Sequence, residues 1–347
     1  MEQAPILVEV TRADTVESRH RGMIAVVNNR GEQIAHLGDT GFVTFLRSSA
    51  KPFQAIPVLT SGAAEHFQIT NRELAIIIAS HNGLDIHTDA VAGLLARAGL
   101  RADMLKCGVH PPYDKAKANE LGPHGATVLH NNCSGKHTGM LVVCKFLGYD
   151  LASYDQPDHP LQQHILSLLA RFADMSTGDI AIGVDGCGVP TFALSLYRMA
   201  LLYAHLVNPN EDRLELPLRQ ACARVTTAMM EFPEMVGSTH GRFDSDLMNA
   251  TRGRLIAKVG AEGVYTVGVM PNQQYPTGLG VSVKIEDGDD RRVRAMVVCE
   301  VLKQLGVLTN DELEQLTHWR RRDVRNRRGE VVGHIEPAFQ LSWSCRS

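Results

Sequence analysis

Strand-like segments lie at both ends of this chain of 347 residues, and helical patterns fill its middle. Short apolar or alternating runs bounded by turn residues predict strands at residues 6–10, 22–27, 33–37, 255–260, 263–270, 278–285 and 331–335. Strands from the two ends can pair in one antiparallel sheet on which helices pack. We therefore predict an α/β fold of the layered α+β kind, with an antiparallel sheet, packed helices and a helical lobe.

The same layout predicts how the chain is divided. We expect a single domain over residues 1–347, made of two packed lobes, because no stretch has the composition of a linker. The terminal sheet segments are expected at about 5–45 and 254–340, and the helical region at about 46–253.

Helices are predicted from apolar periodicity and from start and stop signals. The first opens at Ser48-Ser49-Ala50-Lys51 and runs to about Ala64; the others cover residues 74–79, 87–98, 138–147, 160–173, 192–206, 216–231, 244–251 and 291–305. Capping boxes at Thr70–Glu73 and Thr309–Glu312 mark helix starts. Residues 107–131 are predicted to be irregular, and residues 180–184 to form a buried strand.

Composition excludes several classes of protein. A net charge of −3 gives no reason to expect a nucleic-acid partner, and the basic run at residues 320–328 lacks aromatic residues and is predicted to be a solvated loop. No apolar stretch reaches membrane-spanning length, and residues 1–10 lack the pattern of a signal peptide. Seven cysteines without an export signal favour reduced thiols or a metal site in a cytoplasmic protein.

Ser48 and Lys51 are spaced so that both side chains can lie on one face of a helix, because residues three apart are neighbours on its surface. A lysine that has lost its proton can take the proton of a serine hydroxyl and so create a nucleophile. Burial or a second nearby cation lowers the pKa of a lysine towards neutrality. The pair is weak evidence by itself, because this spacing occurs by chance in many chains.

Cys133, Lys136, His137 and Cys187 form a second group. One helical turn can present the first three together, and Cys187 lies in a glycine-flanked turn after a predicted strand. Two thiolates, one nitrogen ligand and an open position suit zinc. Ligand chemistry favours His137 as the nitrogen ligand, because a lysine must first lose its proton. The alternative is two buried cysteines that bind no metal, since there is no C-x-x-C spacing.

Three short motifs follow one another in the order Ser48-x-x-Lys51, Ser80-His81-Asn82 and Lys258-Val259-Gly260. This order resembles the S-x-x-K, S-x-N and K-[TS]-G boxes of serine β-lactamases, penicillin-binding proteins and serine glutaminases. Val259 has no hydroxyl where those families carry Thr or Ser, which argues against a penicillin-like or cell-wall peptide substrate. Lys258, with Ser80 as its partner, can supply a second cation and a proton relay to the leaving group.

Longer stretches resemble the rhizobial-type L-asparaginase family, at residues 47–54, 80–83, 132–137, 185–190 and 258–263. The resemblance runs from about residue 6 to residue 340. It implies a serine β-lactamase/glutaminase-like fold, an intertwined homodimer, and hydrolysis of L-asparagine to L-aspartate and ammonia. By motif, Ser48 with Lys51 and Ser80 with Lys258 are expected to form two catalytic Ser–Lys pairs.

The resemblance also implies a zinc ion near the substrate, held by Cys133, Lys136 and Cys187. It thus favours Lys136 over His137 as the nitrogen ligand and leaves His137 to the substrate. Part of this family works without tightly bound metal, so zinc is an expected cofactor whose need for turnover is open.

Substrate contacts can be argued from charge. A free amino acid needs a cation for its α-carboxylate and an anion for its α-ammonium group. Arg47 adjoins the proposed nucleophile and Asp185 lies two residues before Cys187, so we assign them these two contacts, with Asn82 and His137 adding hydrogen bonds. The alternative for Arg47 is a structural ion pair.

Three rival functions fit parts of the pattern. A β-lactamase-like or peptidase hydrolase would share the Ser–Lys nucleophile, and a metal-hydroxide amidase would rely on the cysteine group. A non-catalytic zinc-binding regulator would need Cys133 and Cys187 but not Ser48.

Overall fold

The computed structural model describes residues 3–288 and 291–344. It divides into two compact units, each assembled from separate parts of the chain. Unit 1 comprises Met1–Thr44, Leu194–Asn208 and Asp246–Ser347, and unit 2 comprises Phe45–Ala193 and Pro209–Ser245. The helix after residue 195, which the sequence analysis placed in the helical region, therefore belongs with the strands.

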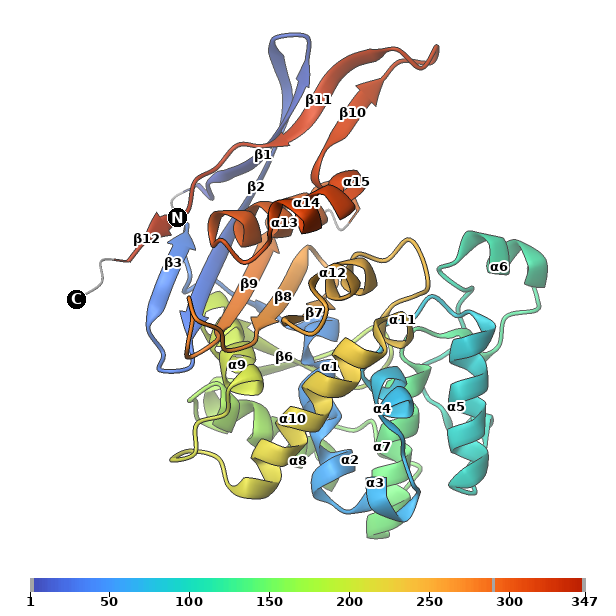
Figure 1. Ribbon diagram of the computed structural model, residues 1–347. Helices are drawn as coiled ribbons and strands as arrows, with labels where there is room; N and C mark the ends of the chain where they lie inside the picture. The colour runs from blue at the N-terminus through green and yellow to red at the C-terminus, as the bar shows by residue number, and fades with distance from the viewer. Residues whose placement is uncertain (1–2, 289–290, 345–347) are drawn as a thin grey trace. The chain divides into compact units, whose positions relative to one another are not determined.

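Unit 1 is built on an antiparallel sheet to which both ends of the chain contribute (Figure 1). Its strands lie in the order β10-β11-β1-β2-β9-β8-β7, and β3 pairs with β2 and with β12. Glu9 of β1 lies opposite Glu336 of β11, so the first strand pairs with one from the end of the chain. The prediction of one sheet shared by strands from both ends is confirmed. The bounds are β1 Ile6–Arg12, β2 Thr15–Asn28, β3 Gln33–Leu37, β7 Leu255–Val259, β8 Val264–Val269, β9 Leu279–Ile285, β10 Arg322–Arg325, β11 Val331–Pro337 and β12 Ser342–Trp343.

Helix α9 (Leu196–Val207) packs on this sheet at close range. A Cβ atom at Gly280 of β9 would lie only 1.7 Å from Ala200 O, so glycine is needed for the helix backbone to approach the strand. Ser282, two residues along the same strand, donates from its hydroxyl to Leu196 O at 2.7 Å. The other helices of the unit are α13 Arg294–Gln304, α14 Asn310–Gln315 and α15 Thr317–Arg320, while α12 Phe243–Thr251 begins in the last residues of unit 2.

Unit 2 is mostly helical, and α4 (Asn71–Ile78) packs against α7 (Ser134–Leu147) within it. The predicted capping box of Thr70 and Glu73 opens α4. A Cβ atom at Gly135 of α7 would lie 2.0 Å from Ile76 O, so this glycine lets the two helix backbones touch. The remaining helices are α1 Lys51–Gln54, α2 Ile56–Thr60, α3 Ala63–His66, α5 Asp85–Arg97, α6 Lys115–Leu121, α8 Pro160–Phe172, α10 Leu216–Glu231 and α11 Pro233–Val236, with 3₁₀ turns η1 Arg47–Ala50, η2 Ala102–Met104, η3 Val128–His130 and η4 Thr177–Asp179.

The single helix predicted from Ser48 to Ala64 is wrong, because the structure has a 3₁₀ turn and three short helices there. Pro57 occupies the first turn of α2, and Gly62 adopts φ 90° before α3. Proline removes a helical hydrogen bond and clashes with the preceding turn, and a residue with positive φ ends a right-handed helix. The segment nevertheless keeps Ser48 and Lys51 one turn apart.

Local predictions also failed in four other places. The helix predicted from residue 192 is preceded by a strand, β6 (Pro190–Ser195), which forms a hairpin with β5 (Ala181–Val184). β5 is largely exposed rather than buried. The supposedly irregular residues 107–131 contain α6, and the basic run contains β10. β6 and β10 form because each pairs with a neighbouring strand, and α6 begins at Asp114, whose side chain accepts from Lys117 N. The exposure of β5 has no such explanation. A further short strand, β4 (Val43–Phe45), lies where the chain passes from unit 1 to unit 2.

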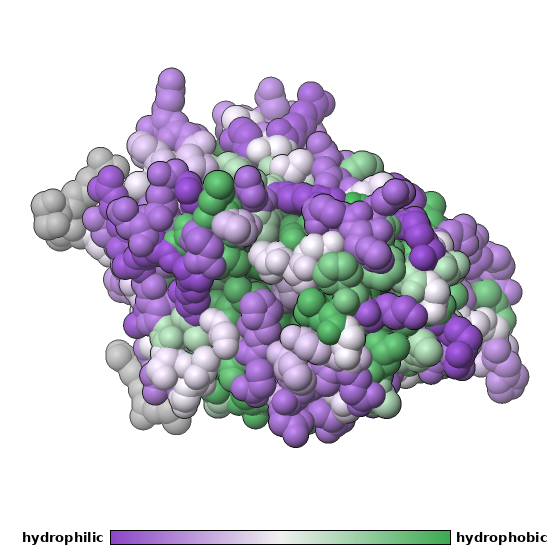
Figure 2. All heavy atoms as spheres, turned by 90° about the horizontal axis from the view of Figure 1, so that it is seen from below, coloured by the Kyte–Doolittle hydropathy of each residue, from purple (hydrophilic) through white to green (hydrophobic). Residues whose placement is uncertain are grey.

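Exposed apolar residues are scattered over the face seen in Figure 2, where hydrophobic patches alternate with hydrophilic ones. Within the described residues, no helix has the length and apolar character needed to cross a bilayer. The six cysteines in this part of the chain are all buried thiols without a disulfide, and the seventh, Cys345, lies outside the described residues.

Candidate active site

Lys51 lies at the start of α1 and is 1% exposed. Its Nζ lies within hydrogen-bond distance of three oxygens: Ala79 O at 2.5 Å, Ser80 Oγ at 2.9 Å and Asn132 O at 3.3 Å. Burial lowers the pKa of Lys51, and the nearby charge of Cys133 opposes this shift only in part. A buried amine with a lowered pKa and a serine within hydrogen-bond distance is a candidate general base.

Ser48 precedes this lysine by three residues in the 3₁₀ turn η1, and the Lys51 N–H donates to Ser48 O. Side chains three apart eclipse one another in 3₁₀ geometry, which keeps Ser48 and Lys51 on one side. Ser48 is half-buried, whereas Ser49 is fully buried. The sequence analysis paired Lys51 with Ser48 and Ser80 with Lys258. Among the described residues, the serine hydroxyl that Lys51 Nζ contacts is that of Ser80.

The Ser80-His81-Asn82 segment follows α4, as predicted, and is held by residues from much later in the chain. Ser80 N donates to Val236 O and Asn82 N to Gly237 O, each at 3.0 Å. Arg242 then donates to Ser80 O at 2.7 Å and to Asn82 Oδ1 at 2.9 Å. The oxygen of the Asn82 amide, which we expected to contact substrate, therefore accepts a hydrogen bond from Arg242.

Arg242 was missed by the sequence analysis. It follows the Gly237–Gly241 stretch, which reads as a flexible turn, and nothing in the local pattern indicates a link to residues 80–82. Its second guanidinium nitrogen pairs with the buried Asp244 at 2.9 Å. A guanidinium that binds three acceptors at once fixes the segment carrying Ser80.

Two histidines stack on one another here, His81 of this segment and His87 of α5. His87 is fully buried; its Nδ1 accepts from Leu84 N at 3.1 Å and its Nε2 faces Glu234 O at 2.9 Å. His81, whose ring stacks on that of His87 at 4.9 Å between centroids, contacts Ser134 Oγ at 3.0 Å. Burial lowers the pKa of His87 to about 4 and holds that of His81 well below its usual value. Both rings are therefore neutral near pH 7 and act as structural hydrogen-bonding groups.

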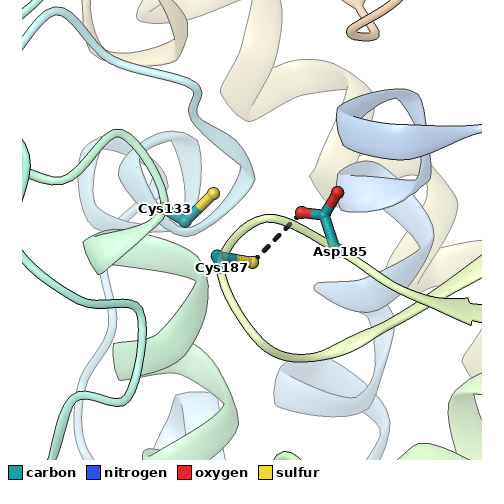
Figure 3. Close-up of side chains that lie close together, drawn as sticks. All are labelled: Cys133, Asp185 and Cys187. Carbon is teal, nitrogen blue, oxygen red and sulfur yellow. Dashed lines mark hydrogen bonds between the residues drawn. The ribbon is translucent and has the colours of Figure 1, made fainter.

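Cys133, Asp185 and Cys187 come together in a compact group, with one ligand atom from each lying within 4.8 Å of the others. Figure 3 shows Cys133 at the start of α7 and the other two on the turn that follows β5. The Cys187 thiol donates to Asp185 Oδ2 at 3.1 Å. The interaction of the Cys133 sulfur with Cys187 lowers the pKa of Cys133 and outweighs burial, which raises it.

Lys136 reaches the same group, with Nζ 2.9 Å from Cys187 Sγ. Burial alone would lower the pKa of Lys136, but the negative charge of the cysteine pair and of Asp185 outweighs burial and raises the pKa. His137 is not a member of this compact group of described residues. Its Nδ1 instead lies 2.7 Å from Tyr154 Oη, and burial keeps its pKa well below the usual value.

This donor set fits a zinc ion. Two sulfur ligands and a carboxylate are chemically suitable, and the lowered pKa of Cys133 favours the thiolate that a metal requires. Lys136, whose pKa is raised, would have to give up its proton before it could bind the metal. Asp185 was not among the ligands expected from the sequence. The spacing of Asp185 and Cys187 in one tight turn was the signal that could have identified it.

Arg47 and Asp185 form an ion pair, with Arg47 Nε 2.7 Å from Asp185 Oδ1. Burial would raise the pKa of Asp185, but Lys136 and Arg47 outweigh it and hold the pKa well below the usual range. Arg47 itself has φ 52°, a left-handed conformation that is unusual for a non-glycine residue and is often found at functional sites. The two residues assigned to opposite ends of the substrate thus contact one another.

Lys258 belongs to unit 1, whereas the other predicted site residues belong to unit 2. It lies on β7, is fully buried, and donates from Nζ to Val259 O at 3.3 Å. Its partnership with Ser80 stays a prediction.

Comparison with known proteins identifies the chain. The family model described as L-asparaginase II matches residues 8–337, which is nearly the whole sequence. The chain is therefore an enzyme of the amidohydrolase class. Within that class it belongs to the L-asparaginase II family, as its sequence motifs suggested. A non-catalytic regulator is no longer a suitable interpretation.

Several solved structures are similar at low identity. A Bacillus glutaminase in 4.3 M NaCl has 14% identity, with 82% of this chain and 91% of the other covered and a TM-score of 0.40. A Bacillus subtilis glutaminase in covalent complex with 5-oxo-L-norleucine has 13% identity over 82% and 88%, with a TM-score of 0.40. A β-lactamase from Burkholderia ambifaria has 15% identity over 84% and 95%, also with a TM-score of 0.40. No curated protein sequence matches the chain. The predicted mixture of helices and antiparallel sheet is confirmed by the strand pairing itself.

Proposed function

We propose that the chain hydrolyses L-asparagine to L-aspartate and ammonia through an acyl-enzyme formed on Ser48. The observation that carries the proposal is the environment of Lys51: a fully buried amine, one turn after Ser48 and bonded to Ser80 Oγ at 2.9 Å. Burial favours the neutral amine, which can accept a proton from a serine.

The chemical steps follow from these groups. Ser48 Oγ attacks the carbon of the substrate carboxamide and gives its proton to the Lys51 amine. The C–N bond then breaks as the nitrogen takes up a proton and leaves as ammonia, which leaves an aspartyl ester on Ser48. Water attacks this ester, its proton returns through the lysine, and L-aspartate is released. We propose that Ser80, which contacts the Lys51 amine, relays the proton to the leaving nitrogen, with Lys258 as its second partner.

Charge supports an amino-acid substrate. Arg47 and Asp185 present a cation and an anion side by side, and a free amino acid carries one group of each sign. We propose that the α-carboxylate binds Arg47 and the α-ammonium group binds Asp185. His137 and Asn82 are proposed to add hydrogen bonds to the same substrate.

Zinc is proposed as a cofactor near this pocket. Cys133, Cys187 and Lys136 would hold it, with Asp185 as an additional candidate ligand, and their spacing supports the assignment. A bound zinc ion would supply positive charge that polarises a nearby carbonyl. The homodimer implied by the family resemblance and the cytoplasmic location predicted from the cysteines stay predictions.

Ammonia release from L-asparagine tests the proposal. Wild-type protein should release ammonia, and Ser48→Ala should lose at least about a thousandfold in kcat. Ser49→Ala is the matched control, because it removes a serine hydroxyl from the neighbouring residue, and it should keep most of its activity. A brief mixing experiment followed by intact-mass measurement should detect one aspartyl group on wild type and none on Ser48→Ala. Full activity in Ser48→Ala that a chelator abolishes would instead identify a metal-hydroxide amidase. Turnover of nitrocefin without release of ammonia from asparagine would identify a β-lactamase-like enzyme.

A further inference from the structure

His137 has one ring nitrogen held by the protein and the other left unsatisfied. Its Nδ1 lies 2.7 Å from Tyr154 Oη, and the two rings meet edge to face. Its Nε2 is buried and has no hydrogen-bond partner among the described residues. The charges of Lys136, Lys51 and Asp185 act on this ring, so it belongs to the electrostatic surroundings of the candidate active site.

Tyr154 is itself constrained from the other side. The Lys106 backbone N–H donates to Tyr154 Oη at 2.9 Å, and a backbone N–H can only donate. One lone pair of the Tyr154 oxygen therefore accepts the Lys106 N–H, and the phenol has a single hydrogen that it can donate. The polar atom within reach of that hydrogen is His137 Nδ1.

Counting unsatisfied groups distinguishes the two neutral forms of the imidazole. If Nε2 carries the hydrogen, Tyr154 donates to Nδ1 and one buried group, the Nε2–H, lacks a partner. If Nδ1 carries the hydrogen, it donates to Tyr154 Oη, and both the phenol hydrogen and the Nε2 lone pair lack partners. A charged ring without a carboxylate partner is disfavoured in a buried position. The form with hydrogen on Nε2 leaves the fewest buried polar groups unpaired.

We infer that Tyr154 is a positioning residue that holds His137 in the tautomer with its hydrogen on Nε2, so that the ring offers a fixed donor to an oxygen of the bound substrate. The inference rests on the proposed function for the identity of the substrate, but not for the state of the ring.

The state of the ring can be measured directly. Two-bond ¹⁵N–¹H correlation spectra of the full-length, ¹⁵N-histidine-labelled protein report which nitrogen carries hydrogen, and the His137 signals are those missing from His137→Gln. We expect a protonated Nε2 and an unprotonated Nδ1, with the other tautomer at about a tenth of the population or less. A hydrogen on Nδ1 overturns the inference, whether or not the protein hydrolyses asparagine.

Tyr154→Phe keeps the buried ring and removes only the hydroxyl. We expect both His137 tautomers to become visible, and KM for L-asparagine to rise about threefold to tenfold with kcat changed less than twofold, because ground-state binding is what is weakened. In the His137→Gln background, whose amide donor has no tautomers, the same substitution should change KM by less than twofold. Tyr275→Phe is the matched control, since it removes another buried hydroxyl, bonded to Leu305 O at 2.8 Å, and should leave the His137 spectrum and the kinetics unchanged.

These measurements separate the inference from the proposed function. An unchanged ratio of the two His137 tautomers in Tyr154→Phe overturns the positioning role, whether or not KM rises. If Tyr154→Phe does not fold, the wild-type spectrum alone still decides which ring nitrogen of His137 carries the hydrogen, and a hydrogen on Nδ1 overturns the inference. Absence of asparagine hydrolysis together with a protonated Nε2 would overturn the proposed substrate and leave the tautomer assignment standing.

Discussion

The effect of acid on stability through His87, the buried histidine that stacks on His81, can be worked out from the structure. His87 is fully buried, with both ring nitrogens hydrogen-bonded, and its pKa is lowered from 6.5 to about 4, chiefly by burial. In the unfolded chain the same ring takes up a proton below about pH 6.5. The unfolded state therefore binds more protons than the folded state between these two values. The stability that the neutral ring contributes is present above pH 6.5 and is lost as the pH falls towards 4.

The size of the effect follows from the pKa difference. Between pH 7 and pH 5 this residue should remove about 2 kcal/mol from the free energy of unfolding, and by pH 4 about 3 kcal/mol. His87→Gln is the matching variant, because glutamine at this position can still accept the Leu84 N–H as in a capping box. It should be less stable than wild type at pH 7 but should lose correspondingly less on acidification.

Urea unfolding followed by far-UV circular dichroism at pH 7, 6, 5 and 4 measures this difference. His124→Gln, which removes an exposed histidine, should follow the wild-type curve. Other buried groups, including His81, titrate in both wild type and His87→Gln, so only the difference between the two curves is diagnostic. Parallel loss of stability in both proteins from pH 7 to pH 5 would refute the reasoning.

Three further outcomes are expected. Gly135→Ala should destabilise the protein by about 3 kcal/mol in thermal or urea unfolding, since the new methyl group meets backbone that cannot give way; unchanged stability would show that α4 and α7 can separate at little cost. Arg242→Met should lower kcat/KM for L-asparagine by about tenfold to a hundredfold, because the segment carrying Ser80 loses its clamp; wild-type kinetics would remove this role. Cys133→Ser should weaken zinc retention more than tenfold in native mass spectrometry, while Cys222→Ser, at another buried thiol, should not; equal retention in both would place the metal elsewhere.

The sheet of unit 1 was predictable because its strands carry their own signals. Each reads as a short apolar run between turn residues, and antiparallel pairing of both ends follows from the order of elements. The capping boxes at Thr70 and Thr309 were equally local and are present as expected. Where the sequence misled, as from Ser48 to Ala64, the apolar content of a helix was present but Pro57 and Gly62 divided it.

The candidate site was only partly predictable, because its members are linked across large sequence separations. The motifs around Ser48, Ser80 and Cys133 were visible as residue types, but not the hydrogen bond from Lys51 to Ser80. Tyr154 and Arg242 carry no motif. Their roles depend on the Lys106 backbone and on the main chain of residues 80–82, which only the folded structure brings to them.

The pairing of β1 with β11 sets a condition on biosynthesis. β1 leaves the ribosome long before β11 is synthesised. The edge of β1 that pairs with β11 therefore stays uncovered until almost the entire polypeptide has emerged. Unit 2 is interrupted by α9 and is likewise finished only when residues 209–245 have been added. Neither unit is encoded by one continuous stretch of the gene, and a premature stop codon before β11 leaves β1 paired with β2 on one side and with an uncovered edge on the other.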